Sequence, residues 1–193
     1  IGVKSFKIEG RLKDVDYVRK IVSYYRNLLD NFSDKTSSGK VITSFVPNID
    51  KTFNRGYTTY FLKERENCFN FDTPKFIGEK VGTVDKIGRG YFTVKSGKNK
   101  SFIPSAQDGL CFDKTGEIGC LVNKVDETNG YIYPNKMPQL KSGMIVYRNV
   151  DVSFEKSISV SQNIRQIGVN LEYNNGRITL VDEDNNSVFC NIT

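Results

Sequence analysis

The 193-residue sequence contains no histidine, and this absence excludes several kinds of site. No Ser–His or Cys–His nucleophile pair can be assembled from the chain, and no histidine is present to bind a metal ion. Any proton transfer would depend on carboxylates, lysines, tyrosines or thiols. We therefore expect the chain by itself to catalyse nothing.

Cysteine is scarce, and long hydrophobic runs are missing. Cys68, Cys111, Cys120 and Cys190 include no CxxC pair, a spacing that argues against a metal site or a disulfide framework. We predict free thiols, as expected in a reducing cytoplasm. No apolar run approaches the about 20 residues of a membrane span, and no signal-peptide pattern opens the sequence.

The composition is that of a globular protein, with 38% hydrophobic and 26% charged residues. A chain of this length can bury one sizeable core or two small ones. It opens directly in a strand-like segment and closes in another at residues 187–193. We therefore expect a piece of a longer polypeptide.

The positive charge is distributed unevenly. Net charge is +6, and residues 1–65 hold 13 Lys and Arg against 7 Asp and Glu, whereas residues 66–193 hold 15 of each. A basic face favours an acidic partner such as RNA. An ordinary solvated surface explains the same charges, and both interpretations remain open.

The clearest periodic pattern predicts a helix from about Asp14 to Asn31, preceded by a strand at residues 1–8. Asp14 is placed to cap the helix. Apolar residues recur every three or four positions and form one stripe. They are Val15, Val18, Ile21, Val22, Tyr25, Leu28, Leu29 and Phe32.

Polar residues lie at the junction between that strand and helix. Glu9, Gly10 and Arg11 occupy the position where strand-then-helix proteins commonly bind ligands. We predict Glu9 and Arg11 as catalytic residues. The alternative is a buried ion pair between them or with a neighbour.

A second polar segment follows Phe53. Gly56 allows a turn whose backbone can approach a ligand closely, and the Arg55 guanidinium suits a carboxylate or phosphate. We predict Asn54, Arg55 and Tyr57 as substrate-binding residues. Arg55 could equally pair with Glu9 and hold this loop to the strand end. We predict that Glu9, Arg11 and Arg55 form one cluster.

The two segments together resemble a known family. KIEGRLK at 7–13, Tyr17, Tyr25-Arg26 and FNRGYTT at 53–59 are similar to the collagenase-like peptidases, peptidase family U32. The family includes proteases and bacterial proteins needed for hydroxylation of tRNA or ribosomal RNA. The resemblance covers residues 1–65 best, and Tyr60 stands where the family usually has glycine.

The resemblance implies that the first strand and helix end an α/β (TIM-like) barrel that lies mostly upstream. An iron–sulfur cluster is possible in that upstream domain, through cysteines outside this chain. We expect no cofactor and no metal within the chain itself.

From Phe76 onward, short apolar segments alternate with turns, which predicts β structure. Expected strands lie at 81–87, 91–94, 110–112, 118–125, 131–133 and 145–148, with a hairpin turn at 128–130. The pattern is similar to the small β-barrel that forms the second domain of translation elongation factors. A connector at 154–160 and strands at 164–173, 177–181 and 187–192 are expected to follow.

Residues 182–186 imitate the opening of a calcium-binding loop. Ser187 stands where such a loop has glycine, and Thr193 where it has glutamate. We predict a hairpin turn there.

The sequence therefore predicts an α+β, mainly β fold. Expected domains are 1–66, the end of a catalytic α/β barrel with its connecting loop; 67–156, a small antiparallel β-barrel; and 157–193, the start of a further β module. The predicted function is the C-terminal fragment of a collagenase-like peptidase, with the β-barrel as an accessory or substrate-binding domain. The alternative is the RNA-binding part of a tRNA or rRNA hydroxylation factor. Expected partners are a peptide or protein substrate, or structured RNA, together with the upstream barrel domain.

Overall fold

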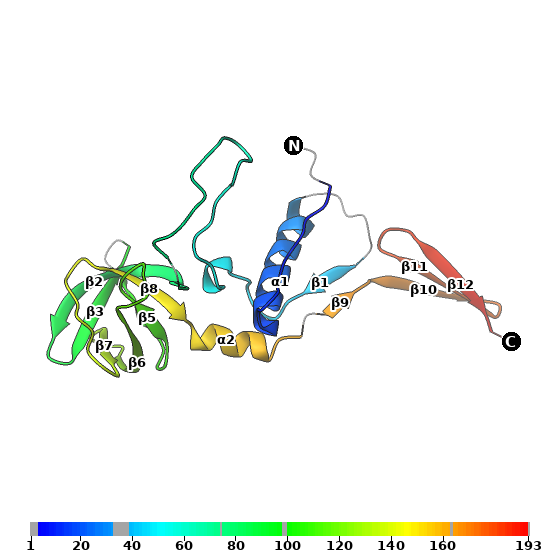
Figure 1. Ribbon diagram of the computed structural model, residues 1–193. Helices are drawn as coiled ribbons and strands as arrows, with labels where there is room; N and C mark the ends of the chain where they lie inside the picture. The colour runs from blue at the N-terminus through cyan, green and yellow to red at the C-terminus, as the bar shows by residue number, and fades with distance from the viewer. Residues whose placement is uncertain (1–3, 33–38, 74, 98–99, 163, 193) are drawn as a thin grey trace. The chain divides into compact units, whose positions relative to one another are not determined.

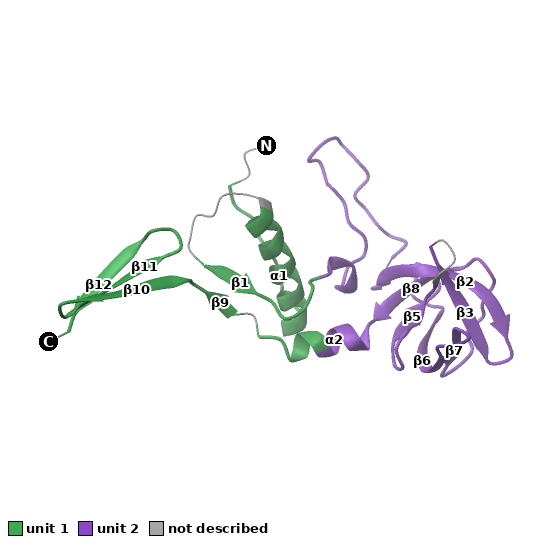
Figure 2. Cartoon of the chain, turned by 180° about the vertical axis from the view of Figure 1, so that it is seen from behind, with its two compact units in different colours: residues 1–47, 157–193 green, residues 48–156 purple. Residues whose placement is uncertain are grey.

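The computed structural model describes residues 4–32, 39–73, 75–97, 100–162 and 164–192. Two compact units make up the chain (Figure 2). Unit 1 comprises residues 1–47 and 157–193, and unit 2 comprises residues 48–156.

Unit 2 is built around a closed antiparallel β-barrel, labelled in Figure 1. The hydrogen-bonded ring runs β2–β8–β5–β6–β7–β3 and closes through pairing of β2 with β3, while β4 extends from β3. The strands are β2 (Glu79–Gly88), β3 (Tyr91–Ser96), β4 (Lys100–Ser101), β5 (Gly109–Cys111), β6 (Gly119–Asp126), β7 (Tyr131–Pro134) and β8 (Ile145–Val150). The prediction of a mainly β fold with a small antiparallel barrel is confirmed.

The barrel closes around an apolar interior. Phe92 on β3 lies opposite Ile132 on β7, and both side chains are fully buried. Core residues lie two positions apart where the strands are regular, as with Phe92 and Val94 on β3, which is why such segments could be recognised as strands. The core consists of Val81, Val84, Phe92, Val94, Leu110, Phe112, Val122, Ile132 and Val146.

The predicted hairpin turn at 128–130 is present between β6 and β7. Asp126 accepts hydrogen bonds from the amides of Thr128 and Asn129, so its carboxylate shapes the turn. A hydrogen bond from the Asn129 side chain at 2.8 Å, together with these amide bonds, lowers the pKa of Asp126.

The segment predicted as a connector at 154–160 is helical instead. Helix α2 runs from Val152 to Ser159, and Asp151 caps it by accepting hydrogen bonds from the Phe154 amide and the Ser153 hydroxyl. This cap satisfies amide groups that the first helical turn cannot pair internally. The expected connector between β8 and β9 is therefore a short helix, which the sequence analysis did not specify.

Unit 1 begins with helix α1 (Val15–Phe32), close to the predicted limits. The Asp14 carboxylate accepts a hydrogen bond from the Tyr17 amide at 2.6 Å, which confirms the predicted cap. Ile21 is buried, but most of the apolar stripe is exposed within the described part of the chain. Among the described helices, none has the length and apolar character to span a membrane.

The strand predicted at residues 1–8 is not found where it can be checked. Residues 4–10 have no regular structure, and residues 1–3 lie outside the described part. A strand requires a hydrogen-bonded neighbour, and no described strand pairs with this segment. That the segment and α1 end a TIM-like barrel stays a prediction.

Two small sheets complete unit 1. Strand β1 (Lys40–Ile42) pairs antiparallel with β9 (Ile164–Gln166). Strands β10 (Val169–Asn174), β11 (Arg177–Asp182) and β12 (Ser187–Asn191) form an antiparallel sheet. The single strand predicted at 164–173 is therefore two strands that belong to different sheets.

The turn predicted at 182–186 joins β11 to β12. The Asp182 carboxylate accepts hydrogen bonds from the amides of Asp184 and Asn186, at 2.9 and 2.8 Å. The acidic residues that imitated a calcium loop thus serve a hairpin turn, as predicted.

Candidate functional site

A long segment without helix or strand joins the 3-10 helix η1 (Ile49–Lys51) to strand β2 in unit 2. Figure 1 draws it as the teal trace that projects beyond the barrel. We call this segment, residues 53–73 and 75–77, the arm. It contains all three predicted substrate-binding residues.

Side-chain hydrogen bonds connect the two legs of the arm. The Thr58 and Thr59 hydroxyls donate to the Glu66 carboxylate at 2.5 and 2.9 Å. These bonds lower the pKa of Glu66. Closer to the barrel, the Asn70 side chain donates to the Arg55 carbonyl. The arm thus has a defined path without a strand ladder.

Asn54 forms the turn from which Arg55 projects. Its side chain donates to the Thr52 carbonyl at 2.8 Å and accepts from the Gly56 amide at 3.2 Å. Gly56 has φ 108°, a conformation that glycine adopts without steric cost. The local turn chemistry therefore explains the Asn-Arg-Gly sequence.

Arg55 and Tyr57 lie next to this turn. The Arg55 guanidinium is exposed and lies 5.7 Å from the centre of the Phe53 ring. The Tyr57 hydroxyl donates to the Ile49 carbonyl at 2.8 Å, while most of its ring remains exposed. The structure thus brings Asn54, Arg55 and Tyr57 together at one exposed turn, where a cation and a ring are accessible to a ligand.

Glu9 is exposed and pairs with a residue other than Arg11. Glu9 pairs with Lys7 at 2.6 Å, and its side chain is 68% exposed, so the alternative of a buried Glu9–Arg11 ion pair is not observed. Both residues belong to unit 1 and Arg55 to unit 2. The proposed cluster of the three stays a prediction.

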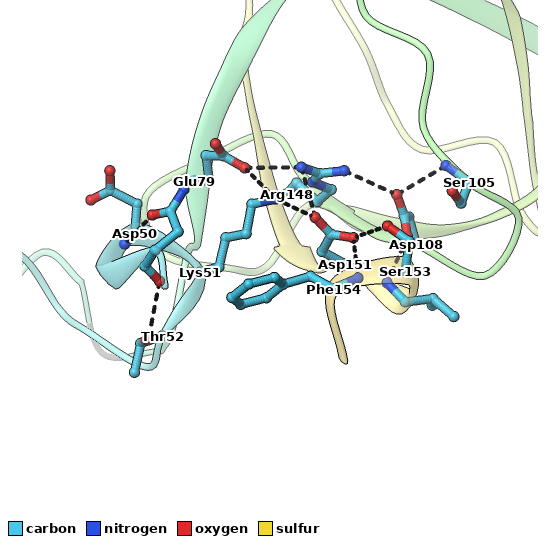
Figure 3. Close-up of polar contacts among 12 residues, drawn as sticks. Asp50, Lys51, Thr52, Glu79, Ser105, Asp108, Arg148, Asp151, Ser153 and Phe154 are labelled. Carbon is cyan, nitrogen blue, oxygen red and sulfur yellow. Dashed lines mark hydrogen bonds and ion pairs between the residues drawn. The ribbon is translucent and has the colours of Figure 1, made fainter. Parts of the chain in front are cut away.

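A buried ionic network holds the base of the arm, as Figure 3 shows. Arg148 on β8 places Nη2 2.8 Å from Asp151 and 3.0 Å from Glu79, and its Nη1 3.5 Å from Asp108. Lys51 contributes a contact of 2.6 Å to the same Asp151 carboxylate oxygen. Lys51 precedes the arm and Glu79 follows it, so both ends of the arm are tied to one ionic cluster.

The network lies in a part of the barrel with little access to water. The Asp108 side chain is fully buried and accepts hydrogen bonds from the amides of Ser105 and Val152. Burial would raise the pKa of Asp151, but bonds from Lys51, the Phe154 amide and Ser153, with the nearby charge of Arg148, lower it to about 2. The Asp151 carboxylate is therefore held charged at neutral pH by its partners.

Sequence reasoning missed this network entirely. Its five charged residues span about a hundred positions, and none lies in a recognisable motif. The one signal in the sequence was a charged residue, Arg148, at the end of the predicted strand 145–148.

The described residues offer no evident metal centre. None of their acidic and cysteine side chains gather in a group of three or more that could hold a metal ion. The four cysteines carry free thiols in this structure.

Comparison with known proteins identifies relatives of this chain. Residues 1–70 match the family model described as Peptidase family U32. The 23S rRNA 5-hydroxycytidine C2501 synthase of Escherichia coli is 34% identical over 97% of this chain and 31% of its own length. The tRNA hydroxylation protein P1 of Bacillus subtilis is 33% identical over 44% of this chain and 21% of its own length.

A third relative has a different activity in its name. A collagenase of Porphyromonas gingivalis is 24% identical over 61% of this chain and 36% of its own length. The chain therefore spans about a third or less of these three relatives. No solved structure matches it.

Proposed function

We propose that this chain, whose residues 1–70 match peptidase family U32, is part of an RNA-hydroxylation protein. One observation carries the proposal. Similarity to the rRNA 5-hydroxycytidine synthase runs through 97% of the chain, and so includes the barrel and the β10–β12 sheet. Similarity to the collagenase is lower, at 24%, and covers 61%.

In this proposal the barrel and its arm bind RNA for a reaction that takes place on the upstream domain. Arg55 contacts a phosphate, because an exposed guanidinium can donate two parallel hydrogen bonds to its oxygens. Asn54 holds the turn, and Tyr57 offers a ring beside it. Any iron–sulfur cluster belongs to the upstream domain.

Glu9 and Arg11 are the catalytic residues of the proposal. Glu9 is exposed and can accept a proton, and Arg11 can stabilise a developing negative charge. Both act with groups supplied by the upstream domain.

The experiment is a gene deletion in the source organism. We expect a hydroxylated pyrimidine nucleoside to disappear from ribosomal or transfer RNA when nucleosides are quantified by mass spectrometry. Restoring the complete protein should restore the modification, and Arg55→Ala should not. Arg89→Ala, in the exposed turn between β2 and β3, is the matched control and should restore it. An unchanged nucleoside profile after deletion would rule the proposal out.

The similarity to a collagenase keeps peptidase activity as the second candidate. We expect the isolated 193-residue chain not to cleave gelatin or casein, with or without added metal ions, since it lacks histidine. Cleavage that survives repurification and is lost in Glu9→Gln would favour the peptidase function.

A further inference from the structure

The arm exposes large aromatic side chains on both of its legs. Phe71 is 86% exposed and Phe69 is 72% exposed, and more than 40% of both Tyr60 and Phe61 is accessible. Exposure of so much apolar surface within one segment indicates a binding surface. Leu62 is the one exposed aliphatic residue of comparable size on the described arm.

The rings are arranged in two pairs. Phe69 and Phe71 lie nearly parallel, at 16° with centroids 6.0 Å apart. Tyr60 and Phe61 lie 4.2 Å apart at 37°. Parallel exposed rings present flat π faces, and stacking on such faces is how proteins hold unpaired bases.

Basic side chains accompany the rings. Arg55, Lys63 and Arg65 are all exposed on the arm. The acidic residues of the described arm are Glu64, Glu66 and Asp72, and the carboxylate of Glu66 is fixed by the hydroxyls of Thr58 and Thr59. Exposed rings interleaved with cations match a flexible strand of alternating bases and phosphates.

Tyr60 occupies a backbone conformation that does not suit it. Its φ is 53°, in the left-handed region where a side chain other than glycine is unfavourable. Glycine would adopt this conformation freely, whereas Tyr60 is 59% exposed and its ring lies against that of Phe61. Tyrosine at this position therefore strains the backbone, and what it contributes in exchange is an exposed aromatic ring.

We propose that the arm binds unpaired RNA bases by stacking on Tyr60, Phe61, Phe69 and Phe71, while Arg55, Lys63 and Arg65 contact the phosphates. This inference rests on the proposed function and specifies single-stranded rather than duplex RNA as the ligand. The exposed cations beside the rings, and the excess of positive charge in residues 1–65, favour a nucleic acid over a protein surface, because they can pair with phosphates.

The test measures RNA affinity of the 193-residue chain by fluorescence anisotropy. The probes are a fluorescein-labelled single-stranded RNA of about 12 nucleotides and the same strand in a duplex. The double variant Phe69→Leu/Phe71→Leu keeps apolar surface but removes both rings, and should weaken single-strand binding by about tenfold or more. Phe71→Tyr retains a ring and should bind like the parent. Tyr173→Leu removes an exposed tyrosine from β10 and should have no effect.

Tyr60→Gly separates binding from folding. We expect weaker binding of the single strand together with an unchanged or higher thermal midpoint, because glycine relieves the backbone while the ring is lost. A lower midpoint would show that the tyrosine serves the fold and would overturn its assignment to the binding surface.

The proposal is overturned if the leucine double variant binds RNA as tightly as the parent, which is the result expected of an arm that docks on protein. Preference of the parent for the duplex would overturn it as well. The nucleoside analysis of the deletion strain is independent of both results, so failure of the RNA surface and failure of the hydroxylation function can be distinguished.

Discussion

Arg148 forms more ion pairs in the network at the base of the arm than any other described residue. Its guanidinium contacts Glu79, Asp108 and Asp151, and it lies 5.4 Å from the centre of the Phe102 ring. Only 14% of the side chain is exposed. The network contains three carboxylates and two cations. Among the described residues, Asp108 forms an ion pair only with Arg148.

Replacing Arg148 should therefore destabilise the protein strongly. We expect Arg148→Met to lower the free energy of unfolding by about 3–5 kcal/mol, since it leaves buried carboxylates without their partner. Arg89→Met, at an exposed turn, should change it by less than about 0.5 kcal/mol. Urea unfolding of both variants measures the difference, and similar midpoints would show that the network contributes little.

Asp151 should make the protein sensitive to acid. Its pKa is lowered from 3.8 to about 2 in the folded state. A lowered folded-state pKa stabilises the protein above the unfolded value, and that stability is lost as pH falls from about 4 to about 2. The contribution amounts to about 2 kcal/mol. Stability measured against pH should fall less steeply in this window for Asp151→Asn, and parallel curves would contradict the assignment.

At the scale of elements, the path of the chain from the arm into strand β2 requires a close approach to the backbone of strand β8. Gly78, directly before β2, has φ 87°, and an added Cβ would lie only 2.0 Å from the Arg148 carbonyl oxygen. The chain can therefore enter β2 beside β8 only with glycine at this position. This contact places Glu79 within reach of the Arg148 side chain.

A pair of glycine substitutions tests this approach. Gly90 also has positive φ, at 83°, but an added Cβ there would meet no atom within 4 Å. Gly90→Ala should cost only backbone strain, about 1–3 kcal/mol. Gly78→Ala should cost about 1–3 kcal/mol more, because β2 must move away from β8. Thermal melts of the two variants provide the comparison, and equal midpoints would refute the close approach.

For the whole molecule, thiol reactivity reports whether the barrel is closed. Burial raises the pKa of Cys111, and it raises that of Cys120 to about 12, so neither forms the reactive thiolate readily. Cys190 is exposed and Cys68 is partly exposed.

Thiol titration should therefore show two classes of cysteine. We expect two thiols to react rapidly in the native protein near about pH 8, and four after denaturation without reductant. Four rapid thiols in the native state would mean an open barrel. Fewer than four after denaturation would indicate disulfides and contradict the prediction of a reducing compartment.

Local patterns in the sequence were sufficient to predict helix α1, its Asp14 cap and most barrel strands. Each of these depends on a repeat of three to four residues or of two, or on a side chain that bonds a nearby amide. The turn at residues 54–57 was recognisable for the same reason, since Asn54 bonds the backbone two residues away. Helix α2 was missed because it is short and its capping residue, Asp151, follows β8 directly.

Features that depend on distant residues became visible only in the folded chain. Whether residues 4–8 form a strand depends on a neighbour, which no local pattern specifies. The ionic network forms because barrel closure brings Lys51, Glu79 and Arg148 together, and no spacing along the chain records that contact. The aromatic and basic residues of the arm were evident in the sequence. That its rings are exposed could be seen only in the folded chain, where other apolar residues form the core. Burial depends on the whole tertiary structure and not on local sequence.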